Sequence, residues 1–292
     1  MAVPVRLRLG DRVYSALLSV AALVAVGVFV SVMWTLGSAA WPAIRAFGIS
    51  FLVSQSWNPG EQLFGAFPYL FGTIVTSLLG IAIALPIAVG TAVALVFLLP
   101  RWLATPLGLV IELLAAVPSI VFGVWGRAVV VPLVRDLSGG TSYGFSILAA
   151  GLVLAAMVLP ILTTVTREML KTVPRDQGDA ALALGSTPWE VTWKVVLPYA
   201  KAGVLAGAIL GLGRAVGETM AVIMVVGNSP VLPKGLFDPG ATAASLIANE
   251  FGDPSGPLHT AALVELGLLL LVMSLVLNLL AKRVVRRLGV RT

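Results

Sequence analysis

The sequence predicts an all-α, polytopic membrane protein with six transmembrane helices. The first observation is composition: 59% of the 292 residues are apolar and only 11% are charged, whereas soluble domains carry about a quarter charged residues. The second is that six apolar stretches each reach the length of about 20 residues that a helix needs to cross a bilayer. The third is that Lys and Arg flank these stretches, which is typical of membrane topology and not of nucleic-acid binding.

Each apolar stretch is interpreted as one span. The six are residues 14–36, 69–99, 107–134, 145–166, 202–227 and 260–281. The first is too long for the hydrophobic region of a cleaved signal peptide, so we expect it to be retained. The second and third contain Pro86, Pro118 and Pro132, where tilts or kinks are expected.

We expect two parts along the chain. Residues 1–68 comprise the first transmembrane helix and a long extracytoplasmic loop, and residues 69–287 comprise a core of five helices with a cytoplasmic loop at 167–201. The extracytoplasmic loop carries Trp41 and Trp57. Because Trp favours the membrane interface, part of this loop is expected to lie flat on the outer surface.

The distribution of basic residues predicts the orientation. With the N-terminus in the cytoplasm, the inner segments hold 14 of the 19 Lys and Arg residues, namely Arg6, Arg8, Arg12, Arg101, Arg167, Lys171, Arg175, Lys194, Lys201, Lys282, Arg283, Arg286, Arg287 and Arg291. The outer loops hold only Arg45, Arg135 and Lys234. The positive-inside rule therefore places both termini and loop 167–201 in the cytoplasm.

Some classes of chemistry are excluded. The chain has no Cys and one His, His259, so neither a thiolate site nor a metal cluster is expected. No Lys follows a Gly, so the Gly-Lys-Ser/Thr loop that cradles nucleotide phosphates is missing. We therefore expect no catalytic residues, no bound cofactor and no ATPase site in this chain.

One hydrolase-like pattern stands out in a short loop. Gly140, Ser142 and Gly144 match the GxSxG pattern, and Asp136 and His259 are expected on the same side of the membrane. The pattern requires a strand–turn–helix context, which a short loop between spans does not supply. An intramembrane hydrolase is therefore the weakest of the alternatives.

The cytoplasmic loop contains two helix signals in succession. Residues 180–184 are good helix formers, and Gly185 is expected to end that helix. Thr187 and Pro188 then offer a new N-cap and first turn, and Pro198 is expected to interrupt the second helix. Two short helices joined at Gly185 would form a compact knob that could move as a rigid body, although an ordinary solvated loop is the alternative.

The same loop carries a signature. The residues that match are Asp179, Ala180, Ala181, Gly185, Leu197 and Pro198. They resemble the EAA signature (E-A-A-x3-G-x9-I-x-L-P) of bacterial ABC-importer permeases, with Asp179 in place of Glu and Val195 in place of Ile. The resemblance implies the type I ABC-importer permease fold and a loop that docks on an ATPase subunit. Asp179 would then contact the ATPase, and Gly185 would set the shape of the knob.

The fifth span combines small residues with two charges. At about 100° per residue, Gly203, Gly207, Gly211, Arg214 and Glu218 fall within an arc of roughly 80° on one helix. The glycines allow close approach of another helix or a substrate. A charge in mid-membrane is costly unless it is paired or faces water. Arg214 is thus expected either to form a structural pair with Glu218 or to line an anion path, since its guanidinium matches phosphate geometry.

Several motifs together resemble one family of permease subunits. They are residues 211–222 (GLGRAVGETMAV) with Gly227-Asn228, residues 112–119 (ELLAAVPS), residues 123–126 (GVWG), Phe67-Pro68 and Gly72-Thr73. The chain resembles the PstC family of phosphate-importer permeases over nearly its whole length. The resemblance implies a bacterial inner-membrane complex with a PstA-like permease, two PstB-like ATPases that bind ATP and Mg, and an extracytoplasmic PstS-like phosphate-binding protein.

Three further charges fall within expected spans. Arg127 and Glu265 are both expected in the outer third of the membrane, where they would pair, line an outer vestibule or snorkel to the interface. Glu112 is expected nearer the cytoplasm.

The expected function is therefore that of a permease subunit which translocates inorganic phosphate by alternating access. Arg214, Glu218, Gly211 and Arg127 are expected along the substrate path. A permease for another oxyanion or polar solute, and a passive channel or membrane scaffold, are the alternatives.

Overall fold

The computed structural model describes residues 9–140 and 142–287. Arg6, Arg8 and Arg291, which contributed to the predicted orientation, lie outside the described residues, as does Thr141 of the GxSxG-like loop. The described residues form helices and loops with two isolated β-bridges. The predicted all-α class is confirmed.

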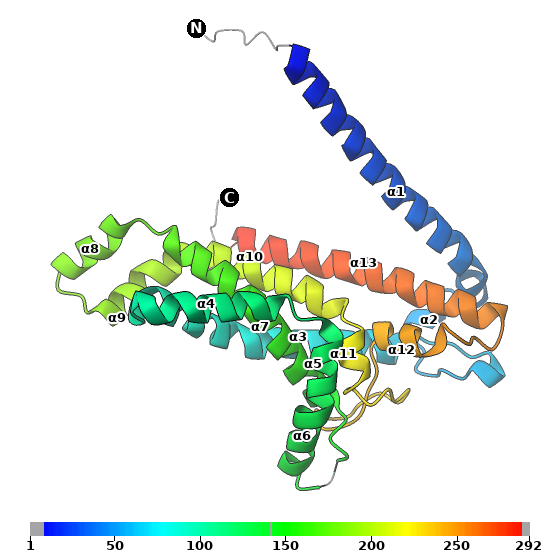
Figure 1. Cartoon of the computed structure of the whole chain (residues 1–292). Helices are drawn as coiled ribbons and strands as arrows, with labels where there is room; N and C mark the ends of the chain where they lie inside the picture. The colour runs from blue at the N-terminus through cyan, green and yellow to red at the C-terminus, as the bar shows by residue number, and fades with distance from the viewer. Residues whose placement is uncertain (1–8, 141, 288–292) are drawn as a thin grey trace.

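The helices follow one another as Figure 1 labels them. They are α1 (Leu9–Phe47), α2 (Ser50–Val53), α3 (Phe67–Val93), α4 (Arg101–Ala115), α5 (Ser119–Trp125), α6 (Val131–Leu137), α7 (Ile147–Lys171), α8 (Arg175–Ala183), α9 (Pro188–Val191), α10 (Leu197–Val216), α11 (Met220–Ile223), α12 (Ala243–Glu250) and α13 (Pro257–Arg287). A 3-10 turn lies at Pro59–Glu61, and π-helical turns lie at Ala94–Leu98, Gly126–Val130 and Thr192–Val196.

Within the described residues, five helices are long and apolar enough to cross a membrane, or up to six if one bent pair counts as a span. The bent pair is Arg101–Ala115 with Ser119–Leu137, and its halves meet at 97°. The kink expected at Pro118 is confirmed, and the third expected span, residues 107–134, is broken there into two helices. Pro118 explains the break, because a proline disfavours helical geometry at the preceding residue and donates no backbone hydrogen bond.

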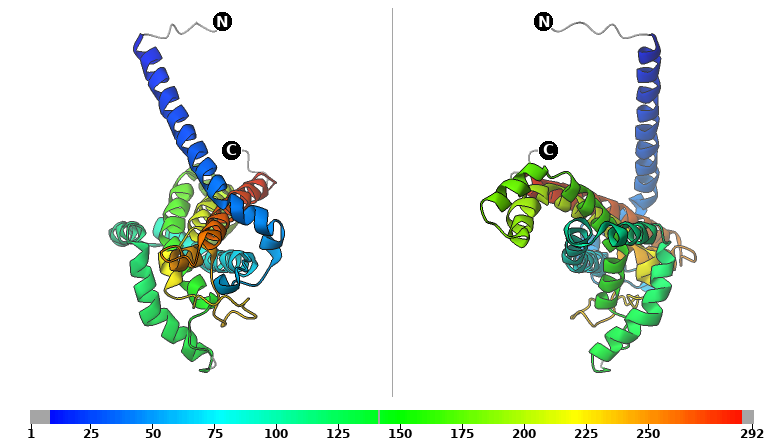
Figure 2. Two further views of the ribbon diagram at one scale, coloured as in Figure 1. Left: turned by 90° about the vertical axis from the view of Figure 1, so that its right-hand side faces the viewer. Right: turned by 60° about the vertical axis from the view of Figure 1, so that its left-hand side comes forward.

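The core lies between α3 and α7, where glycines let the two backbones approach. A Cβ on Gly80 would lie 2.9 Å from the Cβ of Leu154, and a Cβ on Gly151 would lie 2.5 Å from the Leu79 side chain. Helix α10 packs on α7 and α3, and α13 packs on α10 and α1. Figures 1 and 2 show that α1 leans away from this bundle. Most of its apolar side chains are exposed in the single chain, whereas Ala40 and Ala43 near its C-terminal end are buried.

All three π-helical turns end two residues before a proline, namely Pro100, Pro132 and Pro198. In each case the residue before the proline donates its N–H to the carbonyl five residues back, as Leu197 does to Thr192. A proline ring clashes with the carbonyl four residues back, and widening the helix by one residue relieves that clash. Pro86 and Pro160 stand inside helices without such a turn, so a proline alone does not predict one.

The expected interfacial loop at 37–68 takes a different form. Its first part continues α1 as far as Phe47, so the connection begins only at Gly48. Trp57 packs at 5.0 Å from Phe64 and 5.3 Å from Tyr69 between ring centres, and its Nε1 donates to Glu250 Oε2 at 2.8 Å. A polar partner and an aromatic cluster thus hold Trp57 against the bundle, and the expectation that part of the loop lies flat on the outer surface stays a prediction.

Replacing Gly72 by Ala is expected to destabilise the protein by at least about 1–3 kcal/mol, the usual cost of overpacking. A Cβ at residue 72 would lie 2.0 Å from the carbonyl oxygen of Ala241, a backbone atom that cannot rotate aside. Gly90→Ala in the same helix meets nothing within 4 Å and is the matched control. Thermal unfolding of the purified full chain checks this, and equal unfolding temperatures for the two variants would contradict the contact.

Candidate functional site: the two-helix knob and the broken fifth span

The knob forms as the local sequence predicts. Helix α8 ends at Ala183, and Gly185 follows with φ of +91°, which favours glycine. Thr187 then caps α9: its hydroxyl accepts from the Glu190 N–H, and the Glu190 carboxylate accepts from the Thr187 N–H. This capping box satisfies two backbone donors at once. The two-helix arrangement joined at Gly185 is thus confirmed, and Figure 1 shows it projecting at one end of the bundle.

Apolar contacts hold the knob on the spans while leaving part of it uncovered. Val191 and Val196 are buried in one cluster with Val93 of α3 and Leu170 of α7. Beside this cluster lies an apolar cleft of about 580 Å³ with Asp179 on its rim. Such anchoring lets displacement of the knob reach α3 and α7 directly.

The outer surface of the knob presents side chains that are unusual for an exposed loop. Leu184 is 89% exposed and Trp189 is 60% exposed. Asp179 and Ala180 are exposed as well, and the Asp179 carboxylate has no hydrogen-bond or ion-pair partner among the side chains that the structure describes. An apolar patch with a free carboxylate is suited to contact another protein, and sequence reasoning missed the contribution of Leu184 and Trp189.

The helix that follows the knob is longer than expected. Residues 188–216 form one continuous span through the π-helical turn, so the prediction that Pro198 interrupts the helix is wrong. Pro198 directly follows the π-helical turn, whose wider backbone relieves the clash of the proline ring with the carbonyl four residues back. Leu197 and Pro198 thus couple the knob to α10 without a flexible joint.

Helix α10 ends earlier than the predicted span 202–227. It stops at Val216, with Gly217 as its C-cap, and α11 begins only at Met220. Glu218 therefore does not lie one turn further along the helix from Arg214. Its Oε1 instead accepts from the Ala221 N–H at 3.1 Å, and the expected Arg214–Glu218 pair does not form.

Arg214 lies in the last turn of α10 and its side chain is exposed. No described residue forms an ion pair or hydrogen bond with its guanidinium. The helix dipole favours a cation at this end by a fraction of a kcal/mol, which is small beside the cost of a bare charge in hydrocarbon. Arg214 therefore has all its forked donors free at the break in a span.

The glycines of α10 serve packing. Cβ atoms on Gly203, Gly207 and Gly211 would meet Met169, Val165 and Ile81 at 1.9, 3.1 and 3.1 Å, respectively. Gly211 is buried, and its neighbours Ile81 and Leu162 show that it brings α10 against α3 and α7.

Arg127 and Glu265 do not meet. The guanidinium carbon of Arg127 lies 5.8 Å from the ring centre of Phe145, a cation–π geometry. Glu265 is buried in α13, and its Oε2 has no partner among the described residues. Their expected pairing is wrong, whereas Arg127 does line a pocket of about 680 Å³ with Asn228 and Asp238.

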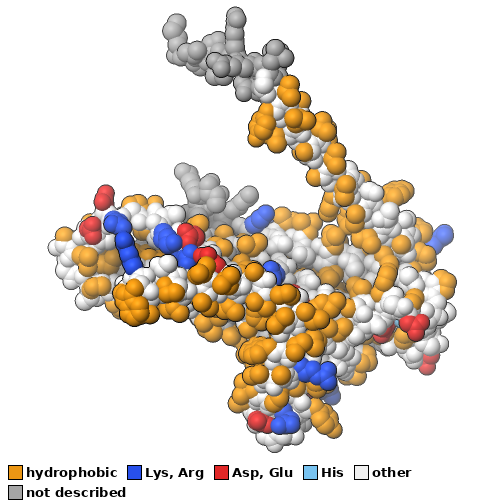
Figure 3. All heavy atoms as spheres, in the orientation of Figure 1, with side chains coloured by type: hydrophobic (Ala, Val, Ile, Leu, Met, Phe, Trp, Pro, Cys, Tyr) orange, Lys and Arg blue, Asp and Glu red, His pale blue; other side chains and the backbone are white. Residues whose placement is uncertain are grey.

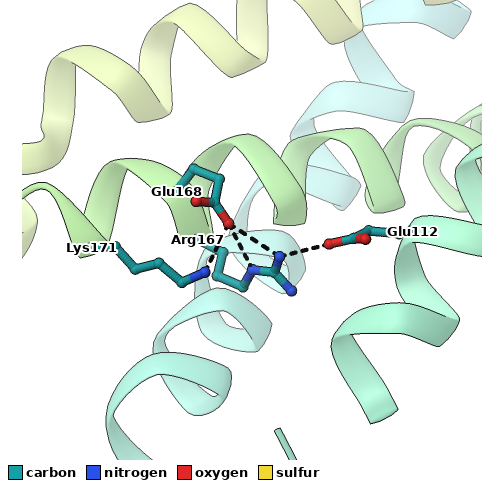
Figure 4. A network of polar contacts seen from close by, with 4 residues as sticks. All are labelled: Glu112, Arg167, Glu168 and Lys171. Atoms are coloured by element: carbon teal, nitrogen blue, oxygen red, sulfur yellow. Dashed lines mark hydrogen bonds and ion pairs between the residues drawn. The ribbon is translucent and has the colours of Figure 1, made fainter. Parts of the chain in front are cut away.

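Glu112 pairs with a residue that the sequence did not single out. Arg167 Nη2 lies 2.6 Å from Glu112 Oε1 and 3.1 Å from Glu168 Oε1, and Lys171 Nζ lies 2.9 Å from the same Glu168 oxygen. Figure 4 shows this chain of charges joining α4 to the end of α7. The spacing of Glu168 and Lys171 on one helix face was a visible signal, whereas the contact between α4 and α7 was not.

The hydrolase-like residues lie in separate places. Ser142 Oγ donates to the carbonyl of Phe237 at 2.8 Å, while His259 Nε2 contacts Glu250 at 2.8 Å and its Nδ1 accepts from Ser255 N–H. Asp136 pairs with Arg135. These residues do not assemble the nucleophile–base hydrogen bond that a triad requires, and no group of metal-binding side chains occurs among the described residues.

The chain was compared with known proteins. The family model described as "Binding-protein-dependent transport system inner membrane component" matches residues 84–290. The phosphate transport system permease protein PstC of Mesorhizobium japonicum is 38% identical over 98% of this chain and 93% of its own length. PstC of Pasteurella multocida is 43% identical over 88% of this chain and 86% of its own, and PstC 2 of Mycobacterium tuberculosis is 38% identical over 95% and 92%.

Solved structures support the same fold. An inward-facing structure of the MetNI methionine ABC transporter contains a chain that aligns with a TM-score of 0.58 and 20% identity, covering 78% of this chain and 95% of that one. The likeness in fold, the apolar helices and the match over residues 84–290 agree with one another. This chain is a multi-pass membrane protein that belongs to the family of binding-protein-dependent transport system inner membrane components, the permeases of ABC importers.

Proposed function

We propose that this chain is the permease subunit of an ATP-driven importer that carries inorganic phosphate across the bacterial cytoplasmic membrane by alternating access. The substrate is suggested by relatives named as phosphate transport permeases that match nearly the whole chain. Both termini and the knob would lie in the cytoplasm, as the distribution of Lys and Arg favours. Residues 1–68 would form the peripheral part and residues 69–287 the permease core.

The observation that carries this proposal is the unpaired guanidinium of Arg214 at the break between α10 and α11. Broken helices at mid-membrane depth are where transporters place substrate sites. A guanidinium offers two parallel donors to phosphate oxygens. Because no carboxylate neutralises Arg214 within the described chain, an anion is the natural partner, and Glu218 nearby would limit how tightly it is held.

Transport would require other subunits. The knob, with Asp179, Ala180, Ala181, Gly185, Leu197 and Pro198, would dock on an ATPase subunit that binds ATP and Mg. A PstA-like permease, a second PstB-like ATPase and an extracytoplasmic PstS-like phosphate-binding protein would complete the complex. The exposed apolar surface of α1 would face lipid or the second permease. ATP-driven closure of the ATPase pair would move the knob and, through Val191 and Val196, the spans that surround Arg214.

Uptake of labelled phosphate into proteoliposomes tests the proposal. The full chain, reconstituted with its co-purifying subunits, is expected to accumulate phosphate only when ATP is inside with the ATPase, and an excess of unlabelled phosphate should compete. Competition by sulfate equal to that by phosphate would favour a different oxyanion. ATP-independent equilibration would instead show a passive channel.

A further inference from the structure

A second charged site lies away from the substrate path, at the end of the bundle near the knob. A pocket of about 390 Å³ opens between α4 and the last turns of α7, and its charged lining consists of Arg101, Arg167, Lys171 and Glu112. Figure 3 shows basic and acidic side chains gathered at this end of the molecule, bordered by hydrophobic side chains. The proposed transport mechanism makes no use of this pocket.

The cations of the pocket differ in how they are held. Arg167 is fixed by Glu112 at 2.6 Å and by Glu168 at 3.1 Å, so its side chain is only 17% exposed. Lys171 is half-exposed beside Glu168. Arg101 is exposed and has no ion-pair partner among the residues that the structure describes. Three cations therefore face two carboxylates, Glu112 and Glu168, which leaves one positive charge in excess.

The backbone of α4 contributes to the shape of the pocket. Gly108 is buried, and a Cβ there would lie 2.3 Å from the Nη1 of Arg167, so the guanidinium occupies the space that any other residue would fill. Glycine at position 108 thus allows Arg167 to lie flat against α4, with its charge directed into the pocket.

The surroundings of the pocket are apolar and lie at the ends of spans. Arg167 and Lys171 occupy the last turns of the apolar helix α7, and Arg101 begins α4 directly after Pro100. Leu109, which lines the pocket, is 57% exposed, and Trp102, seven residues earlier on the same face of α4, is 73% exposed. Trp at such a position is typical of a membrane interface. Basic residues at helix ends beside an exposed Trp are thus typical of the depth at which phospholipid headgroups lie, and an exposed apolar stripe on α4 leads away from the pocket.

We propose that this pocket binds the phosphate headgroup of an anionic phospholipid, whose acyl chains lie along the exposed apolar face of α4. Free phosphate shares the headgroup chemistry, but it would gain nothing from Trp102 and Leu109. A lipid adds acyl-chain contacts to the charge attraction, and each basic side chain near an anionic membrane surface contributes about 1 kcal/mol, or roughly fivefold in binding. The inference requires only that the pocket lies at a membrane interface, and it holds whichever solute the permease carries.

The test is to count bound lipids on the purified full chain. The protein is placed in nanodiscs of phosphatidylglycerol and phosphatidylcholine with identical acyl chains at equal mole fractions, and retained lipids are identified by native mass spectrometry. The wild-type protein is expected to retain phosphatidylglycerol selectively. The Arg101→Gln/Lys171→Gln double variant should lose that selectivity by about tenfold or more, while Lys282→Gln, an exposed basic residue on α13 outside the pocket, should keep it.

A variant that leaves the charge unchanged distinguishes binding in the pocket from general attraction between basic side chains and anionic lipid. Gly108→Ala displaces only the end of the Arg167 side chain and should also weaken phosphatidylglycerol retention. Equal retention of the two lipids by the wild type, or full selectivity in the double variant, would overturn the proposal. Displacement of the lipid by millimolar inorganic phosphate would assign the pocket to a soluble anion, and loss of ATPase co-purification in the double variant would assign it to a subunit contact.

Discussion

Replacing Arg214 by Gln is expected to lower ATP-driven phosphate uptake by roughly 10- to 100-fold. A hydrogen bond to a charged group contributes about 1.5–3 kcal/mol. Apart from Lys201, near the other end of the helix, α10 has no basic residue that could replace Arg214. The side chain is exposed and unpaired, so its loss should not destabilise the bundle. Uptake in proteoliposomes, normalised to folded protein from a thermal unfolding assay, measures the effect.

Two companion variants show whether Arg214 acts through its paired donors or only through its charge and bulk. Arg214→Lys keeps the charge but not the paired donors, so it should restore only part of the uptake. Glu218→Gln should have a smaller effect, because the amide oxygen can still accept from the Ala221 N–H. Lys282→Gln is the control for loss of one basic residue. Normal uptake in both Arg214→Gln and Glu218→Gln would remove the proposed anion path.

Replacing Gly185 by Val is expected to uncouple transport from ATP hydrolysis. Gly185 has φ of +91°, a conformation that costs a β-branched residue about 1–3 kcal/mol. Nothing lies within 4 Å of its Cβ position, so the change acts through the backbone and not through a clash. The turn between α8 and α9 should therefore rearrange, and ATP-driven uptake should fall by roughly tenfold or more.

The control for this variant is Gly139→Val, which introduces similar backbone strain at φ of +65° in open space between α6 and α7. Gly185→Val should lose ATPase co-purification and, with it, ATP-driven uptake, whereas Gly139→Val should retain the ATPase. The charge reversal Asp179→Lys should weaken ATPase attachment in the same assay, because its carboxylate is exposed and free within the described chain. If Gly185→Val and Gly139→Val bind the ATPase equally well, the knob is not the docking element.

Local rules predicted the knob well and the fifth span poorly. Gly185, Thr187 and Pro188 act on neighbouring backbone groups, so their effects can be deduced from sequence alone. The extent of a buried helix is different, because hydropathy continues through Gly217 to Gly227 although the helix stops at Val216. That difference separates Arg214 from Glu218, and it turned an expected ion pair into a free guanidinium.

Partners distant in sequence were also beyond prediction. Glu112 and Arg167 are 55 positions apart and meet only because α4 packs on α7. Arg127 and Glu265 were expected at similar depth, but equal depth does not place two helices side by side. Trp57 likewise donates to Glu250, which lies 193 positions further along the chain.

The sequence by itself determined the membrane class, the approximate number of spans, the two-helix knob and its relation to importer permeases. These properties follow from composition, from local backbone preferences and from motifs that are contiguous in the chain. Only the tertiary structure decided that Arg214 has no carboxylate partner, that Gly211 serves helix packing, and that Arg167 joins Glu112. Those outcomes depend on where helices end and which of them touch, because a side chain's charge is neutralised by its neighbours in space and not by its neighbours in sequence.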